Sequence, residues 1–155
     1  MALFSSELQN PNTKLFILDT GRIEHRDIDF EMYSWNKHRY NLVEPGDHVV
    51  ICVNGVFGMR MADVAERAGA QVTRLERPWG EVFRPEDLAE TLKTNPPKLV
   101  GIVMAETSTG AWQPLEEISQ LVHEHGALLV VDAVTSLGGV PVKVDDWEID
   151  AIYSG

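Results

Sequence analysis

Three short, almost continuous apolar runs alternate with helix-like segments in the second part of the chain. The runs are residues 48–53 (HVVICV), 99–104 (LVGIVM) and 127–131 (ALLVV). A strand that is apolar on both faces is typical of a parallel sheet covered by helices on both sides. Because parallel strands need crossover connections, the pattern predicts a three-layer α/β fold with a mostly parallel sheet and right-handed connections.

The segments between these runs predict the crossovers and some shorter strands. Helices are expected where apolar residues recur at helical spacing and a glycine or proline follows, at residues 59–68, 85–94 and 114–125. Shorter strands are expected at residues 15–18, 71–75 and 150–153. We therefore expect a poorly defined segment over residues 1–40 and a partial α/β domain over residues 41–155.

Composition disfavours several classes of protein. The 155 residues include 13 Lys and Arg against 24 Asp and Glu, and no basic stripe is present to bind nucleic acid or an anionic membrane. The lone Cys52 cannot form an internal disulfide, which favours a reducing compartment. No secretory signal or membrane-spanning run is visible. We expect a protein of the cytoplasm or an organelle, the peroxisome and mitochondrion included, and not a secreted one.

Ligands of such sheets bind at the carboxyl ends of the strands, so the residues after each strand are candidates for chemistry. The first long run is followed by residues 54–58 (NGVFG), in which two glycines flank the aromatic ring of Phe57. Glycine permits close backbone approach, and Phe57 could stack on a flat ligand. A tight turn with a phenylalanine in the core is the alternative.

Polar residues also follow the other two long runs. Residues 106–110 (ETSTG) offer three hydroxyls that could donate to a phenolate or phosphate, or could cap the next helix. Asp132 closes the third run, where a carboxylate is costly unless a cation or a hydrogen-bond donor meets it. A protonated ring nitrogen would meet it, and so would an amide of the following loop.

Other site types find little support in the sequence. His123 and His125 are separated by one residue on an expected helix and do not share a face, so they make a poor metal pair. No Cys/His cluster, GxSxG elbow or phosphate-binding GxxxxGK[ST] loop is present, and no metal site is predicted. The lack of a GxGxxG motif disfavours an unrelated dinucleotide-binding domain.

Four ordered motifs together resemble the class V, fold-type I aminotransferases, which depend on pyridoxal 5'-phosphate. The motifs are N-G-x-[aromatic]-G, E-[ST]-S-T-G-x-x-Q-P-L, V-D-A-V-T-S-L-G-G and D-x-x-Y-S-G, in residues 41–155. The branch they resemble is the alanine–glyoxylate or serine–glyoxylate (serine–pyruvate) aminotransferases. The resemblance implies amino-group transfer from alanine or serine to glyoxylate or a related 2-oxo acid, by a homodimer in the full-length form.

The resemblance implies cofactor-binding roles for Phe57, Thr107, Asp132 and Val134. Asp132 would pair with the protonated pyridine nitrogen and so make the ring an electron sink. Phe57 and Val134 would contact the two faces of the ring, and Thr107 would donate to its phenolic oxygen. A desulfurase or lyase of class V is an alternative, because the same residues serve the cofactor whatever the substrate.

Three departures from the family pattern predict an incomplete catalytic apparatus. In the family, Y-S-G is followed by [ST]-Q-K, whose lysine forms the Schiff base, whereas here Gly155 is the last residue and none of the lysines matches the motif. The phosphate-binding turn before residue 41 and the C-terminal small domain are also not found. We therefore expect a truncated chain without a catalytic residue, whose alternative role is non-catalytic cofactor binding or partnership with a full-length subunit.

Addition of pyridoxal 5'-phosphate, alanine and glyoxylate to this chain should give no turnover, because no lysine of the motif is present to carry the proton between substrate atoms. The measurement is pyruvate formation, with a full-length relative as the positive control. Pyruvate formed faster than in the protein-free reaction would contradict this prediction.

Overall fold

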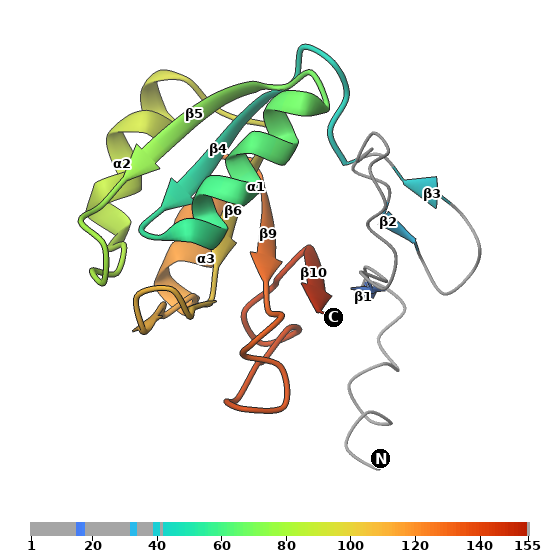
Figure 1. The fold of residues 1–155 in the computed structure, drawn as a ribbon. Coiled ribbons are helices and arrows are strands. Elements are labelled where there is room, and N and C mark those ends of the chain that lie inside the picture. Colours follow the sequence, from blue (N-terminus) through green and yellow to red (C-terminus); the bar gives the residue numbers. More distant parts are fainter. Residues whose placement is uncertain (1–14, 18–31, 34–38, 41, 155) are drawn as a thin grey trace.

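A six-stranded parallel sheet forms the middle layer of the fold in the computed structural model, which describes residues 15–17, 32–33, 39–40 and 42–154 (Figure 1). Its strands are β1 (Leu15–Ile17), β4 (His48–Val53), β5 (Gln71–Glu76), β6 (Leu99–Val103), β9 (Leu128–Asp132) and β10 (Ala151–Ser154). Their order across the sheet is β1-β10-β9-β6-β4-β5, and each neighbouring pair is parallel. The predicted α/β fold with a mostly parallel sheet is confirmed.

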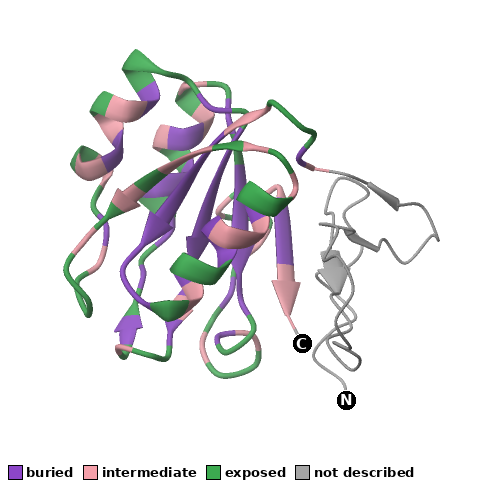
Figure 2. Ribbon diagram, turned by 45° about the horizontal axis from the view of Figure 1, so that its top comes forward, coloured by how far each residue is buried: buried purple, intermediate pink, exposed green. Residues whose placement is uncertain are grey.

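Three helices in the described ranges connect the strands and cover the two faces of the sheet. They are α1 (Val56–Arg67), α2 (Pro85–Thr94) and α3 (Glu116–Glu124). Figures 1 and 2 show α1 on one face of the sheet, with α2 and α3 on the other. Two small antiparallel pairs complete the described elements, β2 (Met32–Tyr33) with β3 (Arg39–Tyr40), and β7 (Ala105–Glu106) with β8 (Ala111–Trp112).

The strand β4 shows why helices are needed on both faces. Alternate residues Val50 and Cys52 pack into the core cluster under α2 and α3, while Ile51 and Val53 pack into the cluster under α1. All four side chains are almost completely buried. Burial of an aliphatic side chain of this size contributes about 1.5–3 kcal/mol, so an uncovered face would be strongly destabilising.

The parallel strands bring several strand ends to one edge of the sheet. Asp132 at the end of β9 lies in register with Val103 of β6 and with Tyr153 of β10. The backbone N–H of Met104 donates to the Asp132 carbonyl at 3.0 Å, so the chain after β6 runs beside the end of β9. The segments that follow β4, β6 and β9 therefore lie at the same carboxyl edge.

The sequence prediction was wrong at two places near this edge. Helix α1 begins at Val56 and not at residue 59, which places Phe57 in its first turn. Residues 105–112 form the β7–β8 hairpin, where only a turn was expected. Most of residues 1–40 lie outside the described residues, so the division of the chain at residue 41 stays a prediction.

None of the helices in the described ranges has the length and the apolar character needed to cross a lipid bilayer.

Gly58 lets α1 pack closely against β4, and this contact gives a test of the packing. A Cβ atom at this position would lie 2.7 Å from the Cys52 carbonyl oxygen and 3.0 Å from the Val53 Cα, both backbone atoms of β4. Gly58→Ala should therefore lower the free energy of unfolding by about 1–3 kcal/mol, although alanine favours helices. Urea denaturation measures the change.

Met59→Ala is the matched control, because Met59 is the next residue of α1 and its side chain is 44% exposed. This variant should change the free energy of unfolding by less than about 0.5 kcal/mol. A Gly58→Ala protein as stable as the parent would show that α1 does not approach β4 this closely.

Candidate functional site

Asp132 is a buried carboxylate that forms no ion pair with any Lys, Arg or His in the described part of the chain. Asp132 is 8% exposed. It lies on the sheet face that α1 covers, because Val130, two residues earlier in β9, packs in the core cluster under α1. Oδ1 accepts a hydrogen bond from the Val134 backbone N–H at 3.0 Å, and Oδ2 accepts one from the Tyr153 hydroxyl at 2.9 Å. Each oxygen keeps a lone pair for a further donor.

Burial is the largest influence on the charge of Asp132, and it raises the pKa of this carboxyl. The hydrogen bonds from Val134 and Tyr153 and the charge of Arg60 act in the opposite direction, whereas the negative charge of Glu106 adds to the rise. Because a buried carboxylate is favoured by a nearby positive charge, the site is suited to a cationic hydrogen-bond donor.

Tyr153 supplies the donor that comes from the neighbouring strand β10. Burial, together with the adjacent Asp132 carboxylate, raises the pKa of the Tyr153 hydroxyl far above its usual range. The hydroxyl therefore stays protonated and donates to Oδ2. The two donors approach different oxygens, so they hold the plane of the carboxylate.

Helix α1 presents an aromatic ring and a guanidinium group to the same region. The Cζ atom of Arg60 lies 5.8 Å from the centroid of the Phe57 ring, within the range of a cation–π contact. The charge of Arg60 also lowers the pKa values of both Asp132 and Tyr153. Arg60 thus contacts Phe57, one turn earlier on the helix, and its charge acts on the carboxylate at the end of β9.

Val134 and Thr107 lie on the two loops that follow β9 and β7. The backbone N–H of Val134 donates to Asp132, and Val134 itself is 42% exposed. The Thr135 hydroxyl donates to the Ala105 carbonyl at 2.8 Å and so ties the two loops together. Thr107 is exposed and immediately follows Glu106, whose charge acts on Asp132.

The structure thus places the four predicted site residues at one edge of the sheet, although they differ in how closely they are linked. Val134 donates a hydrogen bond to Asp132, Phe57 contacts Arg60, whose charge acts on Asp132, and Thr107 lies on the adjoining turn. The hydrogen bond from Val134 also matches the alternative interpretation, in which Asp132 accepts from a loop amide. Because a carboxylate has two oxygens, Asp132 can accept a hydrogen bond from the loop amide and also one from a ligand.

Sequence reasoning missed Arg60 and the function of Tyr153 as a donor. Arg60 is three residues after Phe57, a spacing that places two side chains on one face of a helix. That signal was available once the helix was known to begin before Phe57. Tyr153 could not be assigned, because its contact with Asp132 depends on the register of two strands that are far apart in sequence.

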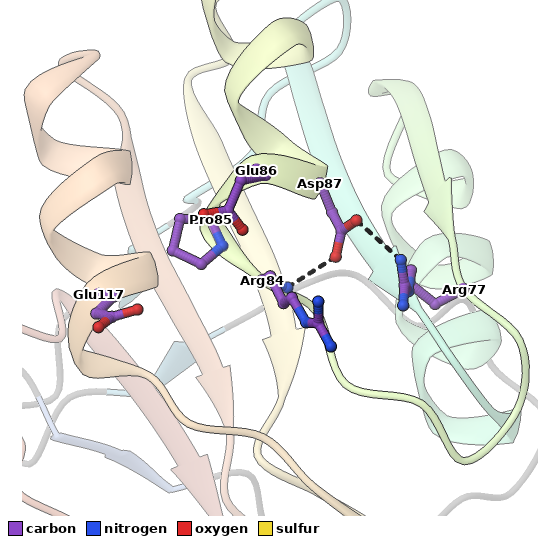
Figure 3. A pocket seen from close by; sticks show the side chains of 6 residues that line it. All are labelled: Arg77, Arg84, Pro85, Glu86, Asp87 and Glu117. Atoms are coloured by element: carbon purple, nitrogen blue, oxygen red, sulfur yellow. Dashed lines mark hydrogen bonds and ion pairs between the residues drawn. The ribbon is translucent and has the colours of Figure 1, made fainter.

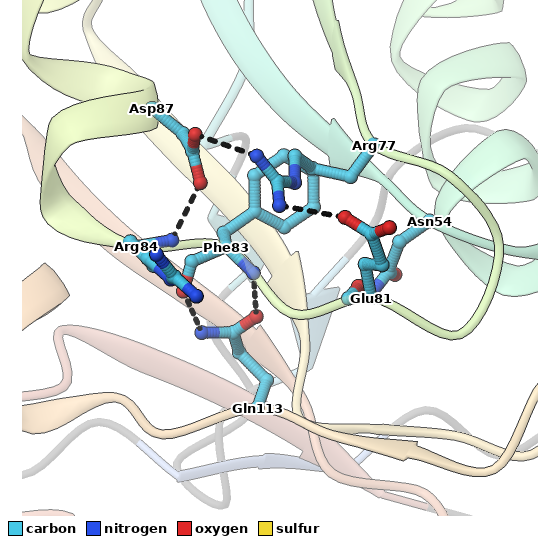
Figure 4. A network of polar contacts seen from close by, with 7 residues as sticks. All are labelled: Asn54, Arg77, Glu81, Phe83, Arg84, Asp87 and Gln113. Atoms are coloured by element: carbon cyan, nitrogen blue, oxygen red, sulfur yellow. Dashed lines mark hydrogen bonds and ion pairs between the residues drawn. The ribbon is translucent and has the colours of Figure 1, made fainter.

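A second polar cluster lies on the opposite face of the sheet. A cleft of about 470 Å³ is lined by Arg77, Arg84, Pro85, Glu86, Asp87 and Glu117 (Figure 3). Arg77 already pairs with Glu81 at 2.7 Å and with Asp87 at 2.9 Å, and Asp87 also accepts from the backbone N–H of Arg84 (Figure 4). These groups stabilise the connection from β5 to α2.

The side chain of Gln113 stabilises the same β5–α2 connection by binding the backbone of Phe83. Its Oε1 accepts from the Phe83 backbone N–H at 2.8 Å, and its Nε2 donates to the Phe83 carbonyl at 2.9 Å (Figure 4). The residue is 1% exposed, so this two-way contact satisfies a buried amide. Gln113, which belongs to the E-[ST]-S-T-G-x-x-Q-P-L motif, therefore has a structural function.

None of the lysines in the described ranges is found in contact with Asp132. Lys98 contacts the Asp47 carboxylate at 2.5 Å, at the amino edge of the sheet, and Lys143 lies 3.8 Å from Asp146. Lys93 lies in the last turn of α2, on the other face. Lys14 and Lys37 lie outside the described residues. In the same ranges, no group of three His, Cys, Asp or Glu side chains is placed to hold a metal ion.

Comparison with known proteins gives a consistent result. The family model described as "Aminotransferase class-V" matches residues 31–155. The (S)-ureidoglycine–glyoxylate transaminase of Bacillus subtilis is 46% identical over 115 residues, which are 74% of this chain and 28% of that protein. The alanine–glyoxylate aminotransferase of Rattus norvegicus is 42% identical over 116 residues, which are 75% of this chain and 28% of that protein.

A solved structure agrees with these relatives. The crystal structure of an alanine–glyoxylate aminotransferase from Nostoc sp. superposes with a TM-score of 0.71 at 54% identity, over 73% of this chain and 30% of that one. The chain therefore spans less than a third of the length of the relatives it matches.

The raised pKa of Asp132 predicts that this residue lowers the stability of the ligand-free protein near neutral pH. An unfolded aspartate titrates near ~3.9, so between that value and the higher folded-state value the folded protein binds more protons, and stability falls as the pH rises. Asp132→Asn should therefore raise the melting temperature at pH 7. The gain should shrink as the pH is lowered through the folded-state pKa, and it should vanish well below ~3.9, where the wild-type carboxyl is protonated in both states.

Asp63→Asn is the matched control, because the Asp63 side chain is 50% exposed on α1. It should give no stabilisation at pH 7. If Asp132→Asn lowered the melting temperature at pH 7, the hydrogen bonds of the carboxylate would outweigh the cost of its burial.

Proposed function

We propose that this chain, which belongs to the class-V aminotransferase family, provides the ring-binding part of a pyridoxal 5'-phosphate site in an aminotransferase. The family depends on this cofactor. The proposed reaction transfers an amino group from alanine, serine or a similar small amino acid to glyoxylate or a related 2-oxo acid. Relatives named as alanine–glyoxylate and ureidoglycine–glyoxylate enzymes support this substrate class. The observation that carries this proposal is the buried Asp132 carboxylate, which has no positively charged partner in contact among the residues that the structure describes.

The residues of the site fit the pyridine ring of the cofactor. A protonated ring nitrogen would supply both the positive charge and the additional donor that the Asp132 carboxylate can still accept. A charge-assisted hydrogen bond of this kind favours the ionised carboxylate and so offsets its burial. Phe57 adds a flat apolar surface on the same side of the sheet.

Each residue would contribute one physical effect. Pyridoxal 5'-phosphate, when bound, supplies an electron sink for negative charge that develops on the substrate. Asp132 would hold a proton on the ring nitrogen, and Tyr153 would keep the carboxylate oriented. Phe57 and Val134 would exclude water from the faces of the ring, and Thr107 would donate to its phenolic oxygen.

The proposal assigns only noncovalent contacts to the described residues. Lys98 and Lys143 are engaged with aspartates, and Lys93 lies on the far face of the sheet. A proton-transferring lysine is therefore not assigned within the described ranges. The binding of the ring can nevertheless be tested separately from turnover.

Binding of 4'-deoxypyridoxine 5'-phosphate provides that test, because this analogue lacks the aldehyde and reports noncovalent binding alone. Asp132→Asn should raise its dissociation constant about tenfold or more, since a hydrogen bond to a charged group contributes about 1.5–3 kcal/mol. Phe57→Ala should weaken binding severalfold through loss of stacking area. Isothermal titration calorimetry measures both constants.

Asp63→Asn should bind the analogue like the parent chain, because its carboxylate is on the exposed side of α1. Absence of binding by the parent chain at millimolar analogue, or equal dissociation constants for the parent and Asp132→Asn, would refute the ring-binding proposal. Reduced binding by Asp132→Asn cannot be ascribed to unfolding if this variant is also the more stable protein.

A further inference from the structure

Glu106 is the most completely buried acidic residue of the site, and its carboxylate joins two separate elements. The residue is 1% exposed. Oε2 accepts hydrogen bonds from the backbone N–H groups of Phe57 at 2.9 Å and Gly58 at 3.1 Å. Oε1 accepts from the Ser108 hydroxyl at 2.5 Å and from the Ser108 backbone N–H at 3.3 Å.

Helix α1 depends on this contact for its N-terminal hydrogen bonds. Gly55 provides no side-chain cap, and the first turn of α1 contains no acidic residue. The unpaired N–H groups and the positive end of the helix dipole favour an anion at this place. Glu106 supplies that anion from a segment about fifty residues later in the chain, and the Ser108 hydroxyl accepts from the Val56 N–H at 3.0 Å.

Gly55 shows how closely the two elements approach. A Cβ atom at position 55 would lie 2.5 Å from the Glu106 Cδ and 2.6 Å from the Ser108 Oγ. The backbone of Gly55 is extended, which any residue can adopt, so the requirement for glycine is steric. The absence of a side chain at position 55 therefore makes room for the carboxylate.

We infer that Glu106 is the positioning residue of the site, an internal anion that locks Phe57 on α1 to Thr107 on the β7–β8 turn. This inference rests on the proposed function, because both residues are assigned to the cofactor ring. Phe57 donates its own N–H to the carboxylate, and Thr107 lies between Glu106 and Ser108, which bind each other. The ring face and the hydroxyl are thus held in one geometry.

The same contact excludes an external anion from the N-terminus of α1. A glycine-containing turn at the start of a helix is a common place for a phosphate group. Here the N–H groups of Phe57 and Gly58 are already bound, and a phosphate would also meet the negative charge of Glu106. The phosphate of the cofactor must therefore be held by other residues.

Glu106→Ala tests this inference by emptying the position of the carboxylate. Formate is small enough to bind the freed N–H groups, so it should raise the melting temperature of Glu106→Ala more than that of the parent chain. The variant should bind 4'-deoxypyridoxine 5'-phosphate about tenfold more weakly, and formate should restore part of the affinity. Glu106→Gln, which keeps the volume but loses the charge, should show weakened binding without a response to formate.

Val122→Ala is the matched control for destabilisation, because Val122 is a fully buried residue of α3, on the opposite face of the sheet. It should lower the melting temperature but leave the affinity for the analogue unchanged. Unchanged affinity of Glu106→Ala, or an equal effect of formate on Glu106→Ala and the parent, would overturn the inference. If the parent chain does not bind the analogue, the proposed function fails, while the formate comparison still decides whether Glu106 is the internal anion.

Discussion

The burial of β4, β6 and β9 on both faces is the constraint on which the rest of this structure depends. Apolar side chains point alternately to each side of these strands, so helices must cover both sides of the sheet. Connections that return behind the sheet make the strands parallel, and parallel strands end at a common edge. The residues that can do chemistry therefore gather there, after strands that are otherwise apolar.

Two buried carboxylates at this edge illustrate different uses of the same functional group. Glu106 receives hydrogen bonds at both oxygens from the start of α1 and from Ser108, and it stabilises the fold. Asp132 receives one bond at each oxygen, and burial raises its pKa. A buried carboxylate with a raised pKa, whose oxygens can each accept a further hydrogen bond beyond those from the described residues, is typical of a binding site. The two carboxylates are related, because Glu106 fixes the elements that surround Asp132.

Much of the fold was predictable, because it depends on local patterns. The strand at residues 48–53 and the helix at 85–94 were predicted with the observed bounds, since the apolar run and the proline-led first turn are local signals. The start of α1 was predicted three residues too late, because glycine usually weakens a helix and the contact that requires Gly58 is with β4. The β7–β8 hairpin was not predicted, because its two-residue strands are too short to show a period.

The sequence by itself determined the α/β class of this protein, the order of its elements and the identity of the candidate residues Phe57, Thr107, Asp132 and Val134, because strand ends and motifs can be read along the chain. Only the tertiary structure decided which groups meet Asp132 and what occupies the N-terminus of α1. Tyr153 reaches Asp132 through the pairing of β10 with β9, and Glu106 reaches α1 across about fifty residues. Such contacts follow from strand register and close packing, which no local pattern of residues encodes.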